Sequence, residues 1–90
     1  MPKSIEYTKG FQKHLIKRFI NQPKVIIELQ VRITMFNNGV RGKPLNDHGL
    51  RGSMKGLRAF SVSGDVRVIY EETDTAYVLW DIGTHNQVYK

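Results

Sequence analysis

The sequence contains no cysteine among its 90 residues, so it has neither disulfide bonds nor thiolate ligands for a metal ion. It also lacks any apolar run close to the roughly 20 residues that span a bilayer, and residues 1–7 lack the apolar segment of a signal peptide. These absences exclude a disulfide-stapled fold and predict a cytoplasmic protein that does not enter a membrane.

Acidic residues are scarce. Eight Asp and Glu stand against 14 Lys and Arg, which gives a net charge of +6 and a pI near 9.8. Six basic and two acidic side chains fall within residues 41–67, so much of the excess lies in one stretch. Such a surplus attracts nucleic acid, an anionic membrane surface or an acidic protein, although a merely soluble basic protein also fits.

The first half of the chain predicts one strand and two helices. Residues 4–7 alternate as in a short strand, and Thr8 is suited to cap a helix whose apolar positions recur every four residues at Phe11, Leu15 and Phe19. A second helix is expected from Pro23 to about residue 37, because proline is tolerated in a first helical turn. Its apolar stripe is Val25, Leu29, Ile33 and Phe36. The short connection predicts a helical hairpin.

The second half predicts strands. Residues 57–62 and 66–70 are expected to pair through a turn at Ser63-Gly64, or through a wider turn that includes Asp65. Residues 77–82 are expected to form the most apolar and central strand, and residues 87–89 a short last strand. The sequence therefore predicts one α+β domain over residues 1–90. Its expected architecture is an antiparallel sheet of four to five strands with the N-terminal helical hairpin packed on one face, in the order β-α-α-β-β-β.

Residues 39–56 contain five glycines and one proline and are expected to form a loop. A long loop in so small a domain is more often functional than idle. The Gly52–Gly56 segment lacks the spacing of a phosphate-binding P-loop, so a nucleotide-binding function is excluded.

Two histidines and an arginine are candidates for chemistry. An imidazole exchanges protons near neutral pH, and His85 follows a glycine at the end of a strand, where a ligand has room to approach. Strand alternation puts Asp65 and Arg67 on the face opposite Val66 and Val68, so we expect Arg67 over the open face of the sheet. Taken singly, His48 and His85 are each more simply explained as structural or solvated side chains than as catalytic ones.

His14 and the spacing of the three histidines give weaker evidence for a functional site. His14 lies on the first predicted helix with no supporting residue nearby in sequence, so we expect it to be solvated. The three histidines have no metal-binding spacing.

The segments at 45–70 and 81–85 resemble the RelE/ParE superfamily of bacterial toxins, and in particular its YafQ-like mRNA interferases. DHGLRGSMKG, GDVRVIY and GTH occur in the family's order, and the resemblance covers nearly the whole chain. It implies a toxin of a type II toxin–antitoxin system that cuts messenger RNA in the ribosomal A site and is neutralised by a cognate antitoxin. It implies no metal or other cofactor.

The resemblance also implies roles for particular residues. His48 corresponds to the general base, His85 to the general acid and Asp65 to the acidic residue of the site. The arginine at 67 would stabilise charge on the scissile phosphate, and a C-terminal aromatic would position a base. The side chains expected to hold message or ribosomal RNA are Arg51, Lys55, Arg58 and Tyr89.

The chain departs from the YafQ pattern at three positions. Ser61 replaces a further site histidine, Ala59 an acidic residue and Met54 a tryptophan. The ParE branch of the superfamily shares the fold but inhibits DNA gyrase without chemistry of its own, and a basic RNA-binding module is a third alternative. The pair of histidines favours the nuclease, because inhibition by binding needs no proton-transfer groups.

Overall fold

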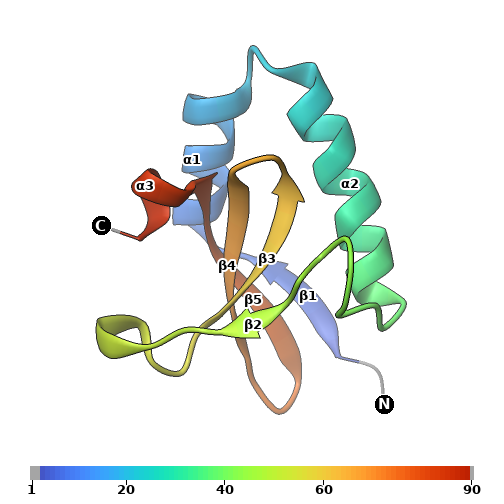
Figure 1. The fold of residues 1–90 in the computed structure, drawn as a ribbon, viewed down its shortest axis with the longest axis vertical. Coiled ribbons are helices and arrows are strands. Elements are labelled where there is room, and N and C mark those ends of the chain that lie inside the picture. The colour runs from blue at the N-terminus through green and yellow to red at the C-terminus, as the bar shows by residue number, and fades with distance from the viewer. Residues whose placement is uncertain (1–2, 90) are drawn as a thin grey trace.

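The helices and strands follow one another along the chain in nearly the order that the spacing of apolar residues predicts. The computed structural model describes residues 3–89 (Figure 1). The first three elements are β1 (Ser4–Tyr7), α1 (Lys9–Phe19) and α2 (Pro23–Asn37). The later ones are β2 (His48–Gly49), the short 3₁₀ helix η1 (Gly52–Met54), β3 (Arg58–Ser63), β4 (Val66–Glu72), β5 (Ala76–Thr84) and α3 (His85–Val88). No helix within this part of the chain is long and apolar enough to cross a membrane.

The five strands form one sheet in the order β1-β5-β4-β3-β2. The predicted α+β class, with a helical hairpin before the main strands, is confirmed. The sheet is antiparallel except at one edge, where β1 pairs with β5 in parallel. The prediction that residues 77–82 form the central strand is wrong, because β1 and β2 occupy the two edges and β4 lies in the middle.

Local signals set the ends of both long helices. The Thr8 hydroxyl oxygen accepts a hydrogen bond from the backbone N–H of Phe11 at 3.0 Å and so caps α1 as predicted. Pro23 opens α2, and Gly39 follows its end with a φ of 92°, the left-handed conformation that glycine adopts without strain. A three-residue link, Ile20–Gln22, turns the chain between the helices.

The main core lies between the sheet and the two helices. Phe11 and Phe19 of α1 and Phe36 of α2 are buried there, as are Val66, Val68 and other side chains on the same face of β4. Each buried phenylalanine contributes about 2 kcal/mol through the removal of apolar surface from water. The valine face of β4 therefore packs on the helices, as predicted.

A smaller apolar cluster covers the other face of the sheet. Ala59 of β3, Ile69 of β4 and Val88 of α3 are buried in it, and the partly buried side chains around them are Leu50, Met54, Leu57 and Tyr89. We call these seven residues the second cluster. This face was expected to be open, but α3 and the segment around η1 cover part of it.

Two predicted boundaries are wrong. The hairpin turn is Gly64-Asp65, because Ser63 still pairs with Val66 and the glycine takes a φ of 49°. The last segment forms α3 and not a strand. Gln87 causes this difference, since its side-chain oxygen accepts the backbone N–H of Thr84 at 2.8 Å and stabilises a helical turn.

Candidate active site

His48 lies in β2 opposite Ala59 of β3, so its side chain is on the face of the sheet that carries the second cluster. The side chain is exposed, and its Nδ1 lies 3.0 Å from the backbone oxygen of Asn46. Because a carbonyl only accepts hydrogen bonds, Nδ1 must carry a proton. In the neutral ring, Nε2 is then free to accept a proton, as a general base requires.

His85 is the first residue of α3 and is also exposed. Its backbone N–H donates to Oδ2 of Asp65 at 3.3 Å, which ties α3 to the turn between β3 and β4. Its ring contacts Tyr89 edge to face, with ring centroids 4.6 Å apart. Since Tyr89 belongs to the second cluster, His85 borders that cluster from the side of α3.

Arg67 lies in β4 opposite Ser61 on one side and Gly83 on the other. Its Nη1 donates to the backbone oxygen of Gly64 at 2.9 Å, so the guanidinium lies close to the turn that carries Asp65. Burial raises the pKa of the Tyr89 hydroxyl, and the positive charge of Arg67 partly opposes this rise in pKa. Tyr89 contributes the one buried side-chain polar atom without a hydrogen-bond partner in residues 3–89.

The cations expected to hold RNA differ in their surroundings. Arg51 and Lys55 are exposed beside η1. Arg58 is bound instead to the Asp47 carboxylate, which lies 2.9 Å from its Nε and has 1% of its side chain exposed. The Tyr70 hydroxyl donates to the other oxygen of that carboxylate, and burial followed by this bond raises the pKa of Tyr70. Arg58 therefore has a structural partner, while 41% of its side chain stays exposed.

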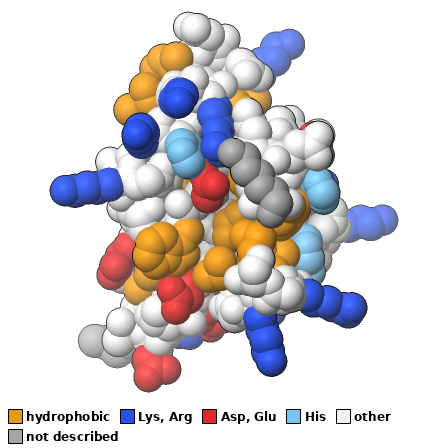
Figure 2. Space-filling model, turned by 90° about the vertical axis from the view of Figure 1, so that its left-hand side faces the viewer, with side chains coloured by type: hydrophobic (Ala, Val, Ile, Leu, Met, Phe, Trp, Pro, Cys, Tyr) orange, Lys and Arg blue, Asp and Glu red, His pale blue; other side chains and the backbone are white. Residues whose placement is uncertain are grey.

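The fold brings some of the predicted site residues together more closely than others. His85 and Asp65 are hydrogen-bonded, and Arg67 and Tyr89 lie beside them. His48 borders the second cluster from β2, and within residues 3–89 no hydrogen bond joins it to any of these four residues. Figure 2 shows histidine side chains at the border of exposed hydrophobic surface on this face, with cations around them.

A hollow with a volume of about 320 Å³ lies beside β2 and includes neither histidine. It is lined by Gly49, Leu50, Gly56, Leu57, Arg58 and Glu72. Within the described part of the chain, His, Cys, Asp and Glu side chains form no group of three or more that could hold a metal ion.

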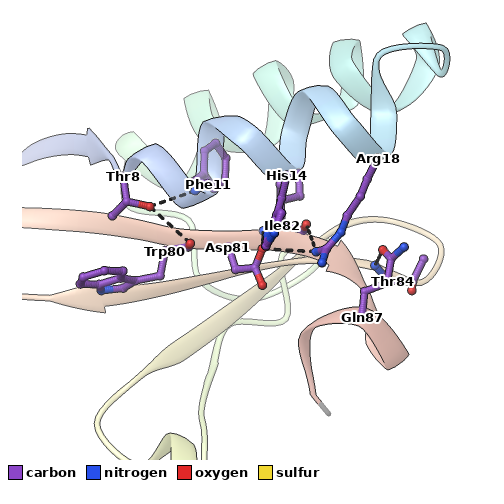
Figure 3. A network of polar contacts seen from close by, with 9 residues as sticks. All are labelled: Thr8, Phe11, His14, Arg18, Trp80, Asp81, Ile82, Thr84 and Gln87. Carbon is purple, nitrogen blue, oxygen red and sulfur yellow. Dashed lines mark hydrogen bonds and ion pairs between the residues drawn. The ribbon is translucent and has the colours of Figure 1, made fainter.

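Sequence reasoning missed a polar cluster at the other histidine. His14 was expected to be solvated, but its Nδ1 lies 2.6 Å from Oδ1 of Asp81 and only a third of its side chain is exposed. Arg18, one helical turn further along α1, binds the same oxygen at 3.3 Å (Figure 3). The i, i+4 spacing of these two residues opposite the only charged residue of β5 was a signal for this contact.

The comparisons with known proteins agree on one family. The profile of the family described as "Bacterial toxin of type II toxin-antitoxin system, YafQ" matches residues 3–90. No curated protein matches the chain at a significant level.

Several solved structures share the fold over nearly the full length of both chains. The crystal structure of YafQ from E. coli strain BL21(DE3) is 29% identical, with a TM-score of 0.81 and coverage of 98% of this chain and 99% of that chain. The toxin of the E. coli DinJ-YafQ toxin-antitoxin complex is also 29% identical, with a TM-score of 0.81 and full coverage of both chains. A copper-bound mutant toxin from Helicobacter pylori is 25% identical, with a TM-score of 0.76, and the match covers 96% of this chain and 98% of that one.

The resemblance seen in the sequence is thereby confirmed for the fold and for the family. The strand and helix order, the length of the match and the family profile all agree. The chain belongs to the YafQ family of bacterial toxins of type II toxin–antitoxin systems.

Proposed function

We propose that this toxin is an endoribonuclease that cuts messenger RNA in the ribosomal A site. The observation that supports it best is the position of His48 and His85, which border the second cluster on the same face of the sheet. The two imidazoles approach that cluster from β2 and from α3, with Arg67 on the strand between them. A phosphodiester placed there would have a proton acceptor on one side and a proton donor on the other.

The proposed reaction uses groups of the protein and of the RNA. Nε2 of neutral His48 takes the proton from a ribose 2′-OH, and the oxygen attacks the adjacent phosphorus. Protonated His85 donates its proton to the 5′-oxygen as the bond from phosphorus to that oxygen breaks, which leaves a 2′,3′-cyclic phosphate. Arg67 stabilises the negative charge that develops on the phosphoryl oxygens, and Asp65 holds the backbone of His85. No metal or other cofactor takes part in this scheme.

The proposed partners follow from the charge of the chain and from its relatives. Arg51 and Lys55 are exposed beside η1, which supports a role for them in binding the backbone of the message or of ribosomal RNA. The E. coli relative YafQ forms a toxin–antitoxin complex with DinJ. We propose that a cognate antitoxin likewise binds this chain, and that the toxin acts in the cytoplasm, where ribosomes translate.

Cleavage of a defined message on programmed ribosomes tests the proposal. We expect His85→Gln and His48→Gln each to slow cleavage by about 10²- to 10⁴-fold, the usual contribution of a general acid or base. Lys17→Gln is the control for a change to glutamine, because Lys17 is exposed on α1 and is not one of the proposed site residues. Cleavage at the wild-type rate in His85→Gln contradicts the assignment of the acid. Growth arrest that persists without both histidines, together with inhibited supercoiling, would favour a gyrase inhibitor.

A further inference from the structure

The end of β5 is held by a charged side chain from the first helix (Figure 3). Nη1 of Arg18 donates to the backbone oxygen of Ile82 at 2.8 Å and to Oδ1 of Asp81 at 3.3 Å. Only 16% of the Arg18 side chain is exposed. A mostly buried guanidinium with two acceptors on one strand is fixed in place, because its charge-assisted hydrogen bonds are strong.

Gly83, the next residue along β5, is packed between two side chains. A Cβ atom at Gly83 would lie 2.6 Å from Nη1 of Arg18 and 2.8 Å from Oε1 of Gln87. That Oε1 also accepts the backbone N–H of Thr84 at 2.8 Å. The guanidinium from α1 and the amide from α3 therefore contact the backbone from Gly83 to Thr84 directly, and this backbone leads into His85.

His14 helps to orient Arg18. Its Nδ1 lies 2.6 Å from Oδ1 of Asp81, the same oxygen to which Arg18 donates, and this oxygen also accepts the backbone N–H of Ile82 at 2.8 Å. Three donors thus fix the carboxylate, and the carboxylate in turn fixes the guanidinium. The result is a rigid connection from α1 to the end of β5.

We propose that Arg18 is a positioning residue for His85. This inference rests on the proposed nuclease function. Arg18 acts through Gly83 and Thr84 and does not touch the RNA. His85 is held from one side by the Asp65 carboxylate and from the other by the backbone from Ile82 to Thr84, which Arg18 fixes. We call this stretch of backbone the corner. An acid that moves by 1 Å loses up to about a hundredfold in rate, so the corner governs how well His85 reaches the leaving oxygen.

Arg18→Met and Arg18→Lys test the proposal in the ribosome assay. We expect Arg18→Met to lower kcat by about 10- to 100-fold, while the ribosome concentration for half-maximal rate changes by less than about twofold. Lysine keeps a positive charge within reach of the Ile82 oxygen, so Arg18→Lys should recover part of the lost kcat. Thr8→Ala is the control, because it removes the cap of α1 and the bond from the Thr8 hydroxyl to the Trp80 oxygen but none of the hydrogen bonds of Arg18.

The NMR signals of the His85 ring give a readout that does not depend on cleavage. The edge-to-face contact with Tyr89 shifts these signals, and we expect Arg18→Met to alter them while Thr8→Ala does not. Wild-type kcat together with unchanged His85 signals in Arg18→Met overturns the proposal. If Arg18→Met does not fold, the same two measurements on Arg18→Lys decide the question. If the wild-type toxin cuts no message, the proposed function fails, and the His85 signals still show whether Arg18 positions the ring.

Discussion

The two oxygens of the Asp47 carboxylate bind different partners: one accepts from the Arg58 guanidinium and the other from the Tyr70 hydroxyl. The carboxylate is buried, with 1% of its side chain exposed. Asp47 immediately precedes His48, and its partners lie in β3 and β4. This contact joins the segment that carries the proposed base to the middle of the sheet.

Asp47→Asn should weaken both the fold and the proposed activity. We expect the free energy of unfolding to fall by about 2 kcal/mol, because the Arg58 guanidinium loses its buried anionic partner. The loss is moderate because the Arg58 side chain is partly exposed to water. Urea unfolding followed by circular dichroism measures this loss. Asp74→Asn is the control, since Asp74 is exposed in the turn between β4 and β5. Equal stability of the two variants would contradict a structural role for Asp47.

The free energy of unfolding should fall steeply at alkaline pH, because the fold is stabilised by the neutral form of the Tyr70 hydroxyl. Burial and the Asp47 bond raise its pKa in the folded chain above the usual value of 10.0. The contribution of the neutral hydroxyl is therefore fully present below pH 10 and is lost as the pH rises from there toward the folded pKa. We expect wild type to lose up to about 1.4 kcal/mol per pH unit more than Tyr70→Phe in this range. Unfolding curves between pH 8 and pH 11 measure the difference, and parallel curves would contradict the assignment to Tyr70.

Gly83→Ala should destabilise the corner between β5 and α3. The new methyl group would lie 2.6 Å from Arg18 and 2.8 Å from Gln87, so one of these side chains must leave its position. We expect a loss of about 1–3 kcal/mol in the free energy of unfolding, as for other overpacked sites. Gly42→Ala is the matched control, because a Cβ atom at Gly42 would meet nothing within 4 Å. Thermal unfolding of both variants checks the prediction.

Ser61→His should increase cleavage if the proposed function is correct. Ser61 lies directly opposite Arg67 in the register of β3 and β4, so a histidine there would lie beside the guanidinium on the site face. We expect at least a roughly tenfold higher cleavage rate, below the full contribution of an optimally placed acid or base. Ser4→His, on the far edge strand β1, is the control. An unchanged or lower rate in Ser61→His would argue that the serine does not limit this toxin.

The exposed side chains of Arg51 and Lys55 near η1 should account for part of the salt dependence of RNA binding. We expect Arg51→Ala and Lys55→Ala each to reduce the slope of log K against log salt by about 0.7, the value for one phosphate contact on a single strand. Both should leave stability unchanged, since the two side chains are exposed. Arg58→Ala should instead lower stability as well, through Asp47. Lys17→Ala on α1 controls for the loss of a positive charge elsewhere.

The fold was predictable where one local signal dominates. Thr8 caps α1, Pro23 opens α2, and the alternation of Val66 and Val68 identifies the face of β4 that packs on the helices. The last segment was not predictable from strand propensity, because the Thr84–Gln87 hydrogen bond outweighs the preference of Val88 and its neighbours for a strand.

The candidate site was predictable only in part. The sequence places Asp65 next to a turn and His85 after a strand, but the bond between them spans 20 residues and depends on the register of β4 and β5. The contact of His14 with Asp81 spans 67 residues and depends on how α1 crosses β5. Such pairings come from tertiary packing, which periodicity along one element does not encode.

The parallel pairing of β1 with β5 has a consequence for how the toxin is made. Ser4 pairs with Ala76, so the first strand to be synthesised stays without its neighbour until β5 has been translated. His85 follows β5 directly, and the proposed acid reaches the sheet at the same stage. The edge pairing of the sheet and the position of the proposed acid are therefore completed together, after β5 and α3 have been translated, and the proposed cleavage activity requires both.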